Sequence, residues 1–151
     1  MGLDMYFTAH RFLWTFPEDG PDQKIAKAIK EHFPELHEDA QFNTVRVEFG
    51  YWRKANAIHD WFVQNVQDGK DECQEAYVSR ESIQKLLDIV NKILADTSLA
   101  PTLLPTADGF FFGSTEYNEW YWKDVEYTKK ILEKALSPDM KQWDYYYQSS
   151  W

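Results

Sequence analysis

The sequence predicts one α+β domain over residues 1–151, with a small antiparallel or mixed sheet covered by about four helices. Two stretches, near residues 3–13 and 43–50, alternate apolar and polar side chains with the period of a strand. Longer stretches repeat apolar residues at helical spacing instead. The length is that of one ordinary domain, so no second independent core is expected.

The first strand is expected almost at the beginning of the chain. One of its faces is apolar, and the other carries Asp4, Tyr6 and His10. An acid and an imidazole on one face could line a cleft, but a solvated strand face explains the same alternation and is the interpretation we favour.

A short helix over 22–33 follows, capped by Asp22 and ended by Pro34. His32 and His37 lie near carboxylates, which could suggest a metal site. The proline keeps these two histidines off a shared helical face, so we expect surface histidines and no bound metal.

The stretch VEFGYWRKANAIHDWFVQNV (47–66) combines a strand end, a glycine, aromatic rings and cations. Gly50 permits a bulge or a sharp turn, and a helix is expected over 52–66. In that register Asn56 faces water, whereas Arg53 and Lys54 occupy the first helical turn. Cations oppose the helix dipole there, so either a nearby carboxylate or an anionic ligand is expected to account for them.

The histidine of this stretch, His59, falls at the edge of the apolar stripe. Such an imidazole is most often half-buried with one hydrogen bond satisfied, and that is the interpretation we favour. A contact with a ligand or a role as general base is the alternative. Trp61 is expected beside it at the rim of the core.

The second half of the chain predicts two further helices and two strands. Ser79 is expected to cap a packing helix over 80–95. Residues 109–113 (GFFFG) predict a short buried strand, after which Ser114 or Thr115 caps a helix over 116–136. A strand is expected over 142–149, so that the C-terminus is docked.

Composition limits the partners. The net charge of −9 makes general attraction to nucleic acid or to an anionic membrane unexpected. The single cysteine, Cys73, excludes an internal disulfide, and no apolar run is long enough for a membrane span. These features predict a soluble cytoplasmic protein, with no membrane or direct nucleic-acid partner and no cofactor.

Three segments resemble a known family when they are taken together: MGLDMY, GYWRKANAIHDWF with the following VSRE, and LLPTADGFFFGSTEYNEWYW with a terminal YYYQSSW. They resemble an uncharacterised family of small proteins encoded by tailed phages and by bacterial genomes that carry them. The family brings no established activity or catalytic residue. The resemblance implies a phage accessory protein in the cytoplasm of a bacterial host, where antagonism of host defence is a common role.

The leading functional hypothesis is sequestration of a small anionic molecule, such as a nucleotide signal, by aromatic and basic residues. The site is expected where the 51–54 turn meets the 112–116 turn, with a dimer interface as one possible setting. The candidate ligand-binding residues are Arg46, Tyr51, Arg53, Lys54, His59, Trp61, Ser114 and Thr115.

Two other classes of function remain open. The first is an acidic inhibitor that blocks a host protein, for example by occupying a nucleic-acid channel with its carboxylates. The second is a small enzyme, for which acid and base groups exist, although no spacing matches a nucleophile elbow, a zinc signature or a phosphate loop. Its candidate acid and base groups are Asp4, His10, His59, Glu116 and Glu119.

Overall fold

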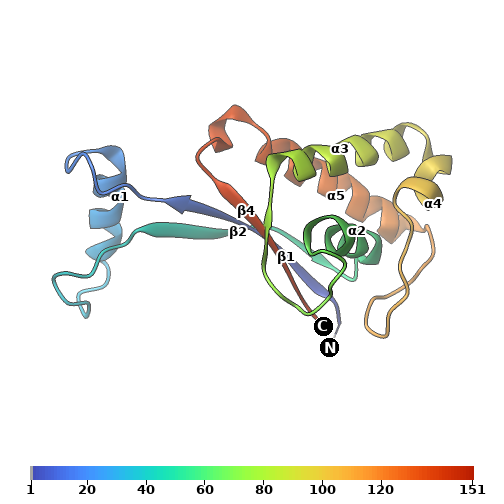
Figure 1. Cartoon of the computed structure of the whole chain (residues 1–151), viewed down its shortest axis with the longest axis horizontal. Coiled ribbons are helices and arrows are strands. Elements are labelled where there is room, and N and C mark those ends of the chain that lie inside the picture. Colours follow the sequence, from blue (N-terminus) through green and yellow to red (C-terminus); the bar gives the residue numbers. More distant parts are fainter. Residues whose placement is uncertain (1) are drawn as a thin grey trace.

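The computed structural model describes residues 2–151 and confirms the α+β class, with an antiparallel sheet of four strands. Figure 1 shows the arrangement of the elements. The strands and helices, in chain order, are β1 (Asp4–Phe12), α1 (Pro21–Lys30), β2 (Thr44–Arg53), α2 (Asn56–Val66), β3 (Ala76–Val78), α3 (Arg80–Ala95), α4 (Ala100–Leu103), α5 (Glu119–Ala135) and β4 (Asp144–Ser150). Short 3₁₀ turns at Thr97–Leu99 and Pro138–Met140 complete the list.

The sheet has the strand order β2-β1-β4-β3, so the first and last strands of the chain are neighbours at its centre. The apolar face of β1 is completely buried against the helices, in agreement with the predicted alternation. The opposite face carries Asp4, Tyr6 and His10 together with Tyr146 and the exposed Tyr77, and remains an open, solvated face.

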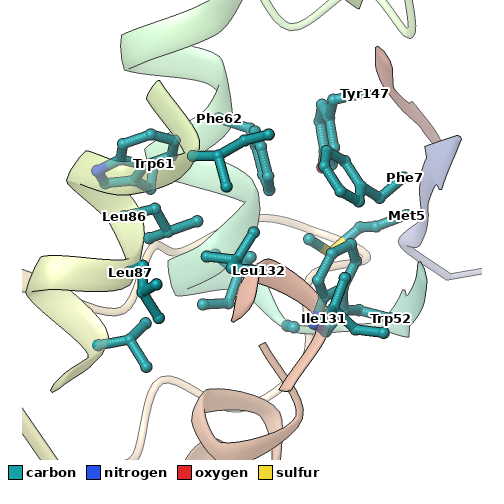
Figure 2. Close-up of a cluster of buried hydrophobic side chains, with 14 of the residues drawn as sticks. Met5, Phe7, Trp52, Trp61, Phe62, Leu86, Leu87, Ile131, Leu132 and Tyr147 are labelled. Atoms are coloured by element: carbon teal, nitrogen blue, oxygen red, sulfur yellow. The ribbon is translucent and has the colours of Figure 1, made fainter. Parts of the chain in front are cut away.

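The core is aromatic, as the composition predicts (Figure 2), and it contains two stacked ring pairs. Phe7 stacks on Tyr145 with ring centroids 5.1 Å apart, and Phe62 of α2 stacks on Tyr147 at 4.1 Å. Such pairs add about 0.5–1.5 kcal/mol each to the stability that area burial provides. The Phe62–Tyr147 pair fixes α2 against the middle of the sheet, whereas the Phe7–Tyr145 pair joins β1 to β4.

Two of the largest buried side chains, Trp52 and Tyr145, have their polar atoms satisfied. The Trp52 indole donates to the Thr128 hydroxyl at 2.9 Å, and the Tyr145 hydroxyl donates to the carbonyl of Ala135 at the end of α5. Arg80 donates to three carbonyls, those of Ala135, Met140 and Trp143, at 2.7–3.1 Å. Arg80 thus joins the start of α3 to the C-terminal end of α5, where a cation is also favoured by the helix dipole.

A two-stranded arm carries α1 away from the helical body (Figure 1). Here the prediction that Asp22 caps α1 is wrong, because Gly20 is the N-cap residue and Pro21 begins the helix. The Asp22 carboxylate instead pairs with Arg11 and accepts from the backbone N–H of Trp14. It therefore ties α1 to the end of β1.

The expected helix start at residue 52 is also wrong. β2 continues through Gly50, with a bulge opposite Phe7, and ends at Arg53, so α2 begins only at Asn56. The strand continues because Trp52 is buried in the core and faces Met5 across the ladder. Gly50 is needed for close packing, since a Cβ there would lie 3.1 Å from Ile131 Cγ2.

The segment GFFFG forms a turn in place of the predicted buried strand. The side chain of Phe110 is 95% exposed, and the N–H of Phe112 donates to the carbonyl of Gly109 within the turn. The cap of the following helix was also predicted at the wrong residue. α5 begins at Glu119, and the Asn118 side chain accepts from the first amides of that helix.

Replacing Arg80 with alanine is expected to lower the free energy of unfolding by at least about 2 kcal/mol, because hydrogen bonds to a charged group contribute about 1.5–3 kcal/mol each. Urea denaturation followed by circular dichroism measures the loss. Lys85→Ala, which removes an exposed cation from the same helix, is the matched control and should change stability little. Equal effects of the two changes would contradict the proposed role of Arg80.

Candidate functional site

One cavity of about 260 Å³ lies where the end of β2, the start of α2, the loop before α5 and the first turns of α5 meet. This is the place predicted from the sequence, since both the 51–54 and the 112–116 segments contribute to its walls. Among the predicted ligand-binding residues, Arg53, Lys54 and Ser114 line it.

The N-terminus of α2 opens into this cavity without a side-chain cap. Its N-cap residue is Ala55, and no acidic residue occupies the first turn. Within residues 2–151 the backbone N–H groups of Ala57 and Ile58 donate to no protein acceptor, and both residues line the cavity. Free amides at the positive end of a helix dipole attract an anion.

Lys54 stands beside this helix end in a strained backbone conformation. Its φ of 59° lies in the left-handed region, which non-glycine residues rarely adopt. The strain is held by the hydrogen bond from its N–H to the carbonyl of Leu3 and by close packing against Gly113. A Cβ at Gly113, whose φ is also positive at 86°, would lie only 3.0 Å from Lys54 Cβ. Strain of this kind often accompanies a functional position.

Arg53, at the end of β2, has no strong carboxylate partner among the described residues. Its Nε lies 3.9 Å from Asp4 Oδ1, and the arginine side chain is 59% exposed. Asp4 accepts a shorter hydrogen bond from the hydroxyl of Tyr51, which lies on the open face of the sheet and does not line the cavity. An exposed ion pair of this length contributes little, so the Arg53 guanidinium remains available to a ligand.

Asn56 was expected to face water, but it is buried, and its side chain holds the loop that forms one cavity wall. Its Nδ2 donates to the carbonyls of Phe112 and Ser114, and its Oδ1 accepts from the N–H of Ala107. The error in register came from the helix start, because a helix that begins at Asn56 turns this first residue toward the loop. An asparagine at a helix start commonly bonds to nearby backbone, which is the signal that the sequence offered.

The α5 side of the cavity carries Asp124 and Trp120, which were not among the sequence-based candidates, and the preceding loop adds Glu116, which was considered as an acid or base. Asp124 is half-buried, forms no ion pair with another described residue, and has its pKa raised by desolvation to about 6. Trp120, at the mouth, is exposed and lies under the ammonium of Lys123 at 4.4 Å. Glu116 adds a second carboxylate. The cavity therefore presents cations and free amides from β2 and α2, and carboxylates with a ring from α5 and the loop before it.

His59 lies outside the cavity, in the core, where it is 1% exposed. Both of its ring nitrogens are engaged: Nδ1 lies 2.7 Å from the Tyr147 hydroxyl and Nε2 lies 3.0 Å from Asp71. Asp71 also accepts from the indole of Trp151 at 3.0 Å, which docks the C-terminus as predicted. The imidazole is thus more buried than expected and has two partners instead of one.

The remaining candidates are also dispersed. Trp61 is buried against Phe62 in the core and does not lie at a rim (Figure 2). Arg46 lies on the arm and pairs with Glu75 at 3.2 Å. Thr115 is exposed next to the cavity, and only its carbonyl is engaged, by the Thr106 hydroxyl.

No family model, curated protein or solved structure matches the chain. No helix within the described part of the chain is long and apolar enough to span a bilayer. Residues 2–151 bring together no group of three histidine, cysteine or acidic side chains that could hold a metal ion.

Asp124→Asn is expected to stabilise the protein at about pH 8 and to have little effect at about pH 4. The raised pKa means that the folded state favours the neutral acid. This contribution to stability is fully present below the ordinary value of 3.8 and is lost as the pH rises through about 6. Asparagine mimics the neutral acid at every pH. Urea midpoints of both proteins across this range test the prediction, and a difference that does not depend on pH would contradict it.

Proposed function

We propose that this protein binds and sequesters a small anionic molecule in the cavity between α2 and α5. The carrying observation is that the uncapped N-terminus of α2, Arg53 and Lys54 all line one cavity. Free helix amides with two cations beside them are a common arrangement for binding phosphate or carboxylate. Strain at Lys54 further supports a binding role for this corner.

The carboxylates and the aromatic ring on the α5 side of the cavity favour a nucleotide over a simple anion as the ligand. Asp124 and Glu116 would repel a phosphate, but carboxylate oxygens accept hydrogen bonds from the N–H edges of a nucleobase. The exposed ring of Trp120 at the mouth offers a stacking surface for such a base. A ligand with a phosphate at one end and a base at the other would satisfy both walls.

The size of the cavity narrows the ligand further. Its volume of about 260 Å³ lies just under the range of roughly 300–1,000 Å³ typical of sites for drug-sized ligands. A mononucleotide suits this volume better than a cyclic dinucleotide, which would project from the mouth.

The arrangement supports binding more than catalysis. Of the five acid and base groups considered from the sequence, only Glu116 lines the cavity. His59 is enclosed in the core, and Asp4 and His10 lie on the open face of the sheet. In the phage context that the sequence resembles, we propose sequestration of a host nucleotide signal as an anti-defence role.

Isothermal titration with inorganic phosphate, purine and pyrimidine mononucleotides and a cyclic dinucleotide tests the proposal. We expect a mononucleotide to bind more tightly than phosphate. Lys54→Gly should weaken its binding about ten- to a hundredfold, because one charge-assisted contact is lost while the left-handed backbone is retained.

Lys129→Ala is the matched control, since it removes an exposed cation of α5 that does not line the cavity. It should leave the affinity unchanged. Absence of binding by every nucleotide tested would contradict the proposed function, as would equal effects of the two lysine changes.

Binding to a host protein is the second candidate, and the arm favours it. Phe12 ends β1, Trp14 and Phe16 lie in the loop that follows it, and the three side chains are 50%, 67% and 77% exposed. Exposed apolar groups that are clustered in this way often mark a contact with another protein.

The double change Trp14→Ser with Phe16→Ser is expected to abolish capture of a stoichiometric host protein in a pull-down, because it removes most of this apolar surface. The matched control is Phe110→Ser, which removes an equally exposed ring from the cavity loop. If a captured protein stayed bound to the arm variant, the contact would lie elsewhere on the molecule.

A further inference from the structure

The edge of β2 in the arm is an unpaired strand edge. The N–H of Leu13 donates to the carbonyl of Asn43, so Asn43 turns its backbone groups toward β1. Every second residue of a strand does the same, so Val45 and Val47 also face β1. Thr44, Arg46 and Glu48 therefore turn theirs outward. Within residues 2–151 the N–H groups of these three residues donate to no acceptor.

This free edge has definite limits. At its C-terminal end the N–H of Tyr51 donates to the hydroxyl of Tyr127, so α5 covers the edge beyond the bulge. Along the arm, no other element lies beside β2 (Figure 1). An exposed edge that is neither covered nor interrupted by proline is a template for pairing with another strand.

The sequence of this edge is complementary to itself. In an antiparallel pairing with a two-fold axis at Val47, Arg46 of one copy lies directly opposite Glu48 of the other, and the reverse pair forms too. Both residues turn their backbone groups outward, so these are hydrogen-bonded pairs and provide about four main-chain bonds. Shifting the register by two residues would place Arg46 opposite its own copy, which is unfavourable.

We propose that two copies of this protein associate through β2, residues 44–48, in this register, and form one continuous eight-stranded sheet. The axis residue also fits this arrangement. Val47 is 37% exposed on the face opposite the charges, and it would pack against its own copy.

One existing contact has to be exchanged. Arg46 pairs with Glu75 within the chain, but both side chains are exposed, at 54% and 36%. Exposed pairs contribute little to stability, so replacing this partner with Glu48 of the second copy costs little. The cavity between α2 and α5 lies on the body and is not part of this interface.

A charge-swap experiment tests the pairing. Sedimentation and light scattering should show a dimer for the wild type at about 100 μM. Arg46→Glu alone and Glu48→Arg alone should each be monomeric, because like charges then face each other across the axis. An equimolar mixture of these two variants should associate again, and the double variant should recover the dimer.

Amide exchange followed by NMR identifies the surface involved. The N–H groups of Arg46 and Glu48 should become protected as the concentration rises, and circular dichroism should confirm that the variants are folded. Glu81→Arg, an equal charge reversal on the exposed face of α3, should stay dimeric. A wild-type monomer throughout this range, or a dimer that both single variants retain, would overturn the proposal.

Discussion

The side-chain amide of Asn56 is the constraint on which the candidate site depends. The chain from residue 105 to residue 118 contains no regular structure, so its position must be fixed by other contacts. Asn56 satisfies three backbone groups of this loop at once, and a buried amide that lost them would cost about 1–3 kcal/mol for each unsatisfied group. Because Asn56 is also the first residue of α2, the loop and the uncapped helix end are held in one fixed relation.

The sheet and the aromatic core provide the rigid frame for that helix end. α2 is stacked through Phe62 onto Tyr147, while His59 joins Tyr147 to Asp71 and through it to Trp151. A histidine that the sequence offered as a ligand contact thus serves to lock the last strand against α2. His59 is therefore not available to a ligand. The cavity instead takes its cations and free amides from the end of β2 and the start of α2, where packing within residues 2–151 leaves these groups available.

Local sequence signals predicted the elements that are decided locally. The helix over 80–95 and its cap Ser79 were predicted to the residue, since an apolar stripe and a capping side chain act within a few residues of each other. The alternation of β1 was confirmed for the same reason, and the predicted C-terminal strand is present as β4. The strand predicted at GFFFG was wrong, because a run of phenylalanines has no period that distinguishes a strand from a turn. The predicted start of α2 was wrong because pairing with β1 extends β2 past Gly50.

The sequence by itself determined the α+β class and the aromatic core, because these follow from periodicity and composition, whereas the meeting of the 51–54 and 112–116 segments was only a hypothesis. Only the tertiary structure decided which groups share the cavity. Asp124 and Trp120 reach it from a helix more than fifty residues away from Lys54, whereas His59 and Trp61, only a few residues from Lys54, are turned into the core. The physical reason is that a site is assembled by long-range packing. Packing sets the direction of each side chain, and it placed Asn56, which was expected to face solvent, against the loop that forms one cavity wall.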